Sequence, residues 1–140
     1  MKNEIKIQWI SSMLFNADTM GGTIKVDGAD DVGGQGKGVR PKALMLTSLA
    51  GCTGMDVVSL LKKMRAEVDN IEIDVSAHLT DEHPKFYKEV HVEYRFYANT
   101  FKKDKIEKSV KLSVERYCGV MEMFRQFAMV TTEIKYIEKA

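Results

Sequence analysis

The 140-residue sequence has few cysteines, few histidines and almost no net charge. Its two cysteines lie far apart, so they are too few for a disulfide scaffold and lack the close spacing of most structural zinc sites. The three histidines, His78, His83 and His91, lie on or beside a predicted hairpin, where we expect solvent exposure and no metal site. Lysine and arginine total 21 against 20 acidic residues, for a net charge of +1. This balance argues against binding to nucleic acid or an anionic membrane.

Long apolar runs and targeting signals are also missing. The N-terminal sequence MKNEIKIQWI has no apolar segment followed by small residues, and no apolar run approaches the roughly 20 residues that span a bilayer. The glycine-rich segment GGQGKGV resembles a phosphate-binding loop only superficially, because Lys37 is followed by Gly38 and not by Ser or Thr. We therefore expect a cytoplasmic protein that has no cofactor and does not contact a membrane.

Alternating apolar and polar residues predict six strands, at 5–9, 13–15, 23–27, 71–79, 90–96 and 131–137. In the first of them, Ile5, Ile7 and Trp9 share one face, which we expect to be buried. The strands at 71–79 and 90–96 read as the two half-exposed strands of an antiparallel hairpin with a long loop. Between the third strand and the first helix, residues 29–39 contain four glycines and are predicted to form a mobile loop.

Helical spacing predicts a long helix that begins at Pro41 and ends near Glu67, and two shorter helices at 102–117 and 119–127 with a break at Cys118-Gly119. The apolar residues of the long helix point in more than one direction, which is typical of a helix buried on all sides. The resulting order, βββ-α-ββ-αα-β, indicates an α+β fold with antiparallel sheets. A chain of this length is expected to form a single domain over residues 1–140.

Two segments carry a resemblance to a known family. RPKALMLTSLAGCTGMDVV (40–58) and SVERYCGVMEMF (113–124) resemble the OsmC/Ohr family of osmotically inducible and organic hydroperoxide resistance proteins, in particular the OsmC-like branch with a GC-x-x-x-DVV helix. The resemblance implies an intertwined homodimer whose sheets wrap the long central helices. It also implies one thiol site in each subunit, near the dimer interface.

The chemistry implied by the resemblance is thiol-dependent reduction of organic hydroperoxides, in defence against oxidative stress. Cys52 would attack the peroxide oxygen and become a sulfenic acid, and Cys118 would condense with it to form a disulfide. An external dithiol reductant would then restore both thiols. From the residues themselves, Cys118 stands just before a helix, whose free N–H groups are expected to lower its pKa. Cys52 lies too far inside its helix for that effect.

The sequence departs from the family pattern where the first cysteine is activated. The family's peroxidases use an arginine from the N-terminal strands, held by a glutamate at the start of the central helix. Residues 1–39 contain no arginine, and Lys42 occupies the glutamate position. Arg40, Lys42 or Arg116, from either subunit, are the candidate replacements. Asp56 lies one helical turn after Cys52, and its carboxylate would raise the thiol pKa unless a basic group pairs with it.

Two alternatives to a peroxidase therefore stay open. The cysteines can be small core residues, because free cysteine is among the most buried residue types. The chain can also be a non-catalytic dimeric module that binds a small apolar ligand. Either a ligand or an alkyl hydroperoxide would suit an apolar pocket near the cysteines, for which the candidates are Met55, Tyr117 and Met121, with Met45 and Met123 nearby.

Overall fold

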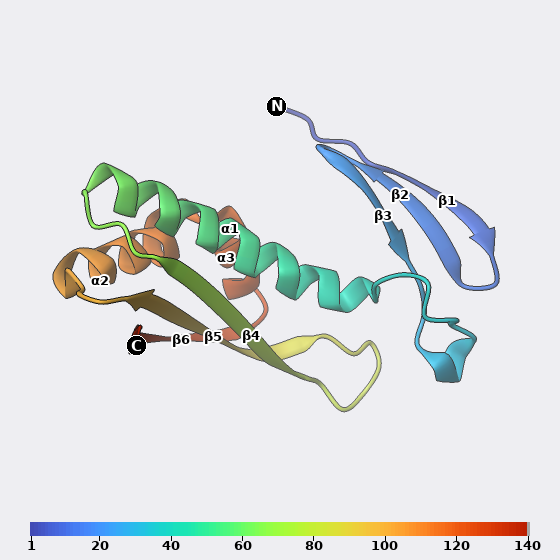
Figure 1. Cartoon of the computed structure of the whole chain (residues 1–140). Helices are drawn as coiled ribbons and strands as arrows, with labels where there is room; N and C mark the ends of the chain where they lie inside the picture. Colours follow the sequence, from blue (N-terminus) through green and yellow to red (C-terminus); the bar gives the residue numbers. More distant parts are fainter. Residues whose placement is uncertain (140) are drawn as a thin grey trace. The chain divides into compact units, whose positions relative to one another are not determined.

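Three strands form the N-terminal part of the structure, a computed structural model that describes residues 1–139 (Figure 1). The chain divides into two compact units, residues 1–45 and residues 46 onward, which are described separately below. In the first unit, β1 (Lys6–Ser11), β2 (Leu14–Thr19) and β3 (Gly22–Val26) form a sheet in sequence order. Their pairing is antiparallel, as predicted. The single-domain organisation over residues 1–140 stays a prediction.

The buried face predicted for the first strand is wrong for the single chain. All six residues of β1 are exposed, and the Trp9 side chain is 66% exposed. Alternation of apolar and polar residues shows that a strand has two chemically different faces, but it does not say what covers the apolar one. A three-stranded sheet in a unit this small has no second layer of its own.

The glycine-rich segment after β3 is anchored by the buried carboxylate of Asp27. This carboxylate accepts hydrogen bonds from the backbone N–H groups of Gly28, Gln35 and Lys37, at 2.8, 3.1 and 3.1 Å. The bonds from Gln35 and Lys37 are the main reason that the pKa of Asp27 lies below its ordinary value. A short 3-10 turn at Asp30–Val32 lies inside the segment. The segment predicted as a loop is therefore tied to one side chain.

Helix α1 (Pro41–Lys63) begins at the predicted proline and ends before the predicted Glu67. Arg65 adopts a left-handed backbone conformation, with φ of 54°, which stops the helix. The side-chain amines of Lys102 and Lys105 donate to the carbonyls of Arg65 and Met64, at 2.8 and 3.0 Å. These contacts satisfy the carbonyls at the helix end, and the sequence pattern of α1 alone does not reveal them.

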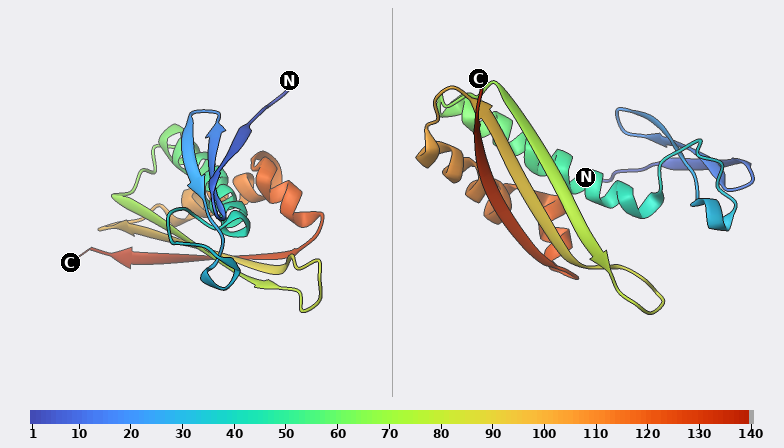
Figure 2. Two further views of the ribbon diagram at one scale, coloured as in Figure 1. Left: turned by 90° about the vertical axis from the view of Figure 1, so that its right-hand side faces the viewer. Right: turned by 60° about the horizontal axis from the view of Figure 1, so that its bottom comes forward.

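The second unit contains a three-stranded sheet in the order β4 (Asn70–Leu79), β5 (Tyr87–Ala98) and β6 (Met129–Glu138). The predicted β4–β5 hairpin is antiparallel, but β6 runs parallel to β5, so the expectation of purely antiparallel sheets is wrong at this strand (Figure 2). Parallel neighbours require a crossover connection. Here α2 (Lys103–Leu112) and α3 (Gly119–Arg125) supply it.

The helices of the second unit lie on one face of its sheet (Figure 1). Side chains of β5 that point to that face, among them Val92, Tyr94 and Phe96, are fully buried. They belong to one cluster with residues from all three helices: Leu49, Val57, Leu61, Ile106, Val110, Met121 and Phe124. The other face of the sheet carries charged and polar residues, which explains the period-2 pattern that predicted these strands.

Helix α1 buries one side and exposes the other in the single chain. Its buried residues recur every fourth position: Leu49, Thr53, Val57 and Leu61. Met55 and Val58 are 75% and 55% exposed, so burial on all sides is wrong for the single chain. By length and composition alone α1 could cross a membrane, with a mean hydropathy of 1.6, contrary to the expectation that no segment is long and apolar enough. The core helix of a soluble protein passes the same test.

The connection between α2 and α3 is a π-helical turn over Ser113–Tyr117. It closes with a hydrogen bond from the N–H of Cys118 to the carbonyl of Ser113, at 2.8 Å. The chain then breaks at Cys118, which is extended, and α3 begins at Gly119 as predicted. π-Helical turns often occur at functional sites.

Candidate active site

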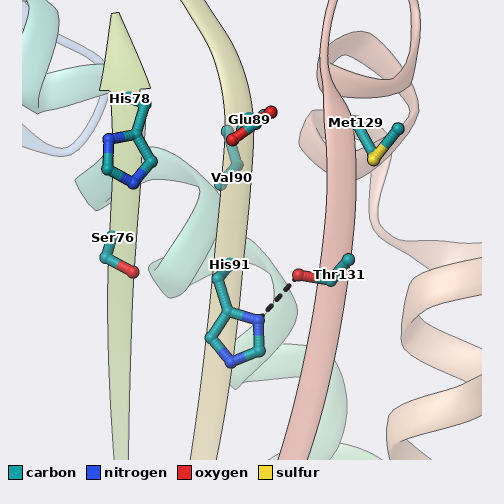
Figure 3. Close-up of a pocket in the computed structure, with 7 residues that line it drawn as sticks. All are labelled: Ser76, His78, Glu89, Val90, His91, Met129 and Thr131. Atoms are coloured by element: carbon teal, nitrogen blue, oxygen red, sulfur yellow. Dashed lines mark hydrogen bonds between the residues drawn. The ribbon is translucent and has the colours of Figure 1, made fainter.

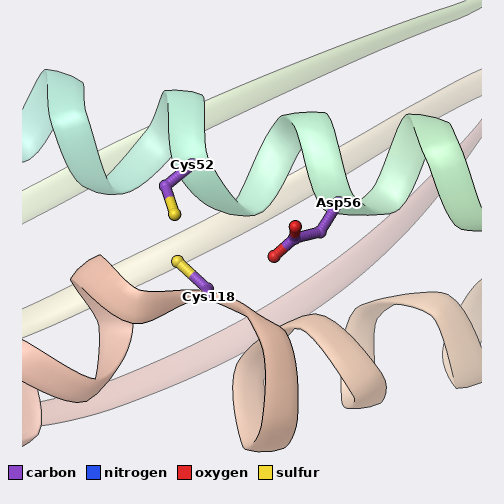
Figure 4. Close-up of side chains that lie close together, drawn as sticks. All are labelled: Cys52, Asp56 and Cys118. Carbon is purple, nitrogen blue, oxygen red and sulfur yellow. The ribbon is translucent and has the colours of Figure 1, made fainter. Parts of the chain in front are cut away.

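The two cysteines meet although they are far apart in the sequence. Cys52 projects from α1 and Cys118 stands immediately before α3, and their sulfur atoms point toward each other (Figure 4). A carboxylate oxygen of Asp56 completes the cluster, and the three atoms all lie within 4.8 Å of one another. Both cysteines are free thiols. Cys52 and Asp56 come together because residues four apart share one face of a helix.

The two sulfurs differ in their access to solvent. Cys52 is partly exposed, whereas Cys118 is only 3% exposed and packs in the core cluster. A molecule arriving from solvent therefore meets Cys52 first. Cys118 stands behind it, within reach of the same sulfur.

Burial makes Cys118 a weak acid. Loss of hydration and, next, the neighbouring Cys52 raise the pKa of the Cys118 thiol to about 12. The N–H of Met121, at the start of α3, donates to the Cys118 sulfur at 3.3 Å and lowers this pKa, as the sequence predicted. This one hydrogen bond lowers the pKa of Cys118 by less than burial raises it, so the predicted net lowering of that pKa is wrong. At neutral pH Cys118 is a protonated thiol.

Asp56 is held by a chain of buried hydroxyl groups. The Ser113 hydroxyl donates to the Asp56 carboxylate at 2.9 Å, the Thr53 and Ser113 oxygens are 2.7 Å apart, and the Thr53 and Tyr94 oxygens are 2.8 Å apart. Each hydroxyl has one proton. Since Ser113 gives its proton to Asp56, Thr53 donates to Ser113 and Tyr94 donates to Thr53. All three donors therefore point toward the carboxylate, an arrangement that suits its ionised form.

No basic side chain among residues 1–139 forms an ion pair with Asp56, although the sequence indicated that one would be needed. Hydroxyl groups take that place. Sequence reasoning missed Thr53, Ser113 and Tyr94, because their types and spacing are ordinary for a core helix, a helix end and a strand. What identifies these three residues as part of the site is the buried position of their side-chain oxygens in the folded chain.

The other predicted residues occupy varied positions. Met121 is fully buried directly after the Cys118 turn, and Tyr117 is 51% exposed with the Arg116 guanidinium 5.5 Å from its ring centre. Met55, three residues after Cys52 in the sequence, and Met123 are both exposed, at 75% and 64%. Arg40, Lys42 and Met45 are exposed residues of the first unit, at the start of α1.

The polar face of the second sheet has a shallow hollow around His78 and His91 (Figure 3). The His91 ring nitrogens lie 2.7 Å from the Thr131 hydroxyl and 3.1 Å from a Glu133 carboxylate oxygen. Within residues 1–139, the histidines join no cluster of three side chains able to hold a metal. His78 and His91 lie on the polar face of the sheet, the place predicted for them.

Comparison with known proteins gives the family. Residues 34–133 match the sequence profile of the OsmC-like protein family. Escherichia coli K12 protein YhfA is 25% identical over 91% of this chain and 93% of its own length. A hypothetical protein of Aquifex aeolicus VF5 superposes with a TM-score of 0.87 at 29% identity, covering 100% of this chain and 99% of its own. The organic hydroperoxide resistance protein OhrB of Bacillus subtilis gives 0.65 at 17% identity, over 96% and 98%. The chain belongs to the OsmC-like protein family.

Proposed function

We propose that this protein reduces organic hydroperoxides with its two thiols. The observation that carries the proposal is the meeting of an accessible and a buried cysteine sulfur within 4.8 Å. Membership of the OsmC-like family and the likeness in fold to proteins named organic hydroperoxide resistance proteins support it.

The first step falls to Cys52 because its sulfur is the accessible one. As a thiolate it attacks one oxygen of ROOH, the O–O bond breaks, and the products are a Cys52 sulfenic acid and the alcohol ROH. The sulfur is oxidised and the peroxide is reduced. Buried Cys118 does not compete for the peroxide, because its raised pKa keeps it protonated.

The second step joins the two sulfurs. Cys118 attacks the Cys52 sulfenic acid, the S–S bond forms, and the hydroxyl group leaves as water after taking a proton. The sulfurs must approach from within 4.8 Å to about 2 Å, a small movement for two side chains. The Asp56 carboxylate oxygen, within 4.8 Å of the Cys118 sulfur, is the group we propose to accept the Cys118 proton after the two side chains approach to hydrogen-bond distance. An external dithiol then reduces the disulfide and returns both thiols.

Activation of Cys52 requires a positive charge, and Arg40, Lys42 and Arg116 are the groups we propose for it, from either subunit. We further infer a cytoplasmic homodimer. Its support is the apolar surface that the single chain exposes, with Ile7 and Trp9 at 49% and 66% in the first unit and Met55 at 75% in α1. Exposed apolar area of this kind marks protein interfaces.

The test measures consumption of an alkyl hydroperoxide such as tert-butyl hydroperoxide by purified protein with a dithiol donor. We expect turnover by the natural protein and none by Cys52→Ser. With the dithiol omitted, Cys118→Ser should reduce about one peroxide per chain and accumulate a sulfenic acid that a diketone reagent traps. Equal turnover by Cys52→Ser contradicts the proposal.

A second candidate is a non-catalytic module that binds a small apolar ligand. The observation in its favour is that, among residues 1–139, no basic side chain forms an ion pair with Asp56, so no cation is held next to Cys52 through this carboxylate. It predicts no turnover and ligand binding that is indifferent to Cys52→Ser. The alkylation rate of Cys52 against pH separates the two, since a peroxidase needs a thiol pKa below about 8.5.

A further inference from the structure

The cluster of Cys52, Asp56 and Cys118 offers three metal-ligating atoms of the kinds that zinc uses. Zinc binds thiolate sulfur at about 2.3 Å and carboxylate oxygen at about 2.0–2.2 Å, so donor atoms of a tetrahedral site lie about 3.5–3.8 Å apart. The present atoms all lie within 4.8 Å. Side-chain shifts of about 1 Å would close the site around an ion.

The charges at this cluster are unbalanced in the direction that favours a cation. The hydroxyl chain from Tyr94 through Thr53 and Ser113 ends as a donor to the Asp56 carboxylate, which stabilises its negative charge. Within residues 1–139 no basic side chain forms an ion pair with Asp56. Cys118 is 3% exposed and lies in the same cluster as this carboxylate, so a divalent ion placed among the three donor atoms would supply the positive charge that the buried site lacks.

We propose that the reduced protein binds one zinc-type divalent cation through the Cys52 and Cys118 thiolates and one Asp56 carboxylate oxygen, with a water molecule as the fourth ligand. Binding is charge-balanced: the dication takes the place of the two thiol protons, which are released to solvent, and the carboxylate contributes one oxygen ligand. The partly exposed Cys52 side leaves room for entry of the ion. Two thiolates and a carboxylate suit zinc better than the oxygen-seeking Mg²⁺ or Ca²⁺.

This inference goes beyond the proposed peroxidase and does not need it. Metal binding and the disulfide use the same two sulfurs, so each excludes the other. An oxidised protein releases its ion, and a metal-loaded protein is protected from oxidation. The structure thus connects the redox state of the thiols with the occupancy of a metal site.

The experiment titrates the reduced, metal-free full chain with Co²⁺, a spectroscopic substitute for zinc. We expect a thiolate-to-cobalt charge-transfer band that saturates at one ion per chain, the release of two protons per ion, and loss of the band on addition of Zn²⁺. Cys118→Ser and Asp56→Asn should lose the band or weaken binding strongly. Ser113→Ala, which removes the donor to Asp56, should weaken binding by about 10–100-fold.

Asp104→Asn, in the first turn of α2 and outside the cluster, is the matched control and should bind as the natural protein does. Oxidation of the natural protein to the disulfide provides a test without any substitution, and it should abolish the band. Absence of a charge-transfer band in the reduced natural protein overturns the proposal. So does a band that is unchanged by oxidation or in Cys118→Ser. Peroxidase turnover is measured on the metal-free protein with a chelator present, so failure of either proposal is seen independently.

Discussion

Replacing Thr53 by valine tests the buried hydroxyl chain that positions Asp56. Valine has the same shape as threonine but neither donates nor accepts a hydrogen bond. In the described chain, Thr53 is the hydrogen-bond partner found for the fully buried Tyr94 hydroxyl, at 2.8 Å. Leaving a buried hydroxyl without a partner costs about 1–3 kcal/mol. Ser113 keeps its bond to Asp56, so we expect Thr53→Val to lower the free energy of unfolding by about 2 kcal/mol.

The companion variant Tyr94→Phe removes the phenol itself. Thr53 then still donates to Ser113, so the expected cost is that of one hydrogen bond, about 0.5–1.5 kcal/mol. In the double variant no phenol is left unpaired. It should therefore cost no more than Thr53→Val alone, because replacing both partners by apolar groups avoids the penalty of the unpaired one.

Urea unfolding of the reduced full chain measures the three values, at one fixed protein concentration because dimerisation would contribute to stability. We expect a coupling free energy of about 1 kcal/mol or more between positions 53 and 94. If the stability loss of the double variant equals the sum of the two single losses within about 0.3–0.5 kcal/mol, the hydroxyl groups do not act as a connected chain.

Three further predictions concern the thiol, the core and the first unit. In Cys52→Ser, alkylation of Cys118 should stay slow through pH 8, because burial, the largest cause of its raised pKa, remains when the Cys52 sulfur is removed. A raised folded pKa means that the neutral thiol stabilises the fold below its ordinary pKa of 9.0, and this contribution is lost as pH rises above that value. Fast alkylation at pH 7 contradicts this. Phe124→Ala, at a side chain 1% exposed, should cost about 3–5 kcal/mol in urea unfolding, and a loss below about 1 kcal/mol would show the core to be wrongly described. If the proposed homodimer uses the exposed face of β1, Trp9→Lys should shift the protein toward monomer in sedimentation velocity, and an unchanged sedimentation profile would remove this face from the interface.

Local periodicity was sufficient to predict most of the fold. The order of strands and helices, the start of α1 at Pro41 and the break at Cys118-Gly119 follow from spacing and turn chemistry. The direction of β6 does not, since a strand pattern is the same for parallel and antiparallel pairing. The exposure of β1 could not be predicted either, because amphipathic spacing does not identify what covers the apolar face of a strand.

For the site, helix geometry predicts that Cys52 and Asp56 share a face, but the arrival of Cys118 beside them came only from the family resemblance. Sequence spacing between the two cysteines contains no distance information. The hydroxyl partners of Asp56 were unpredictable for a different reason: Thr53, Ser113 and Tyr94 come from three elements, and their meeting depends on how the elements pack.

The π-helical turn at Ser113–Tyr117 explains how one short connection serves both partners of α1. In a regular α-helix, residues five apart point about 140° away from each other. Here the bond from the Cys118 N–H to the Ser113 carbonyl spans five residues and brings both side chains to the α1 side. Deleting one residue of the turn would rotate the Cys118 sulfur away from Cys52, although the sequences of the flanking helices and strands would be unchanged. The five-residue length of this turn therefore places Cys118 beside Cys52 while Ser113 stays on Asp56.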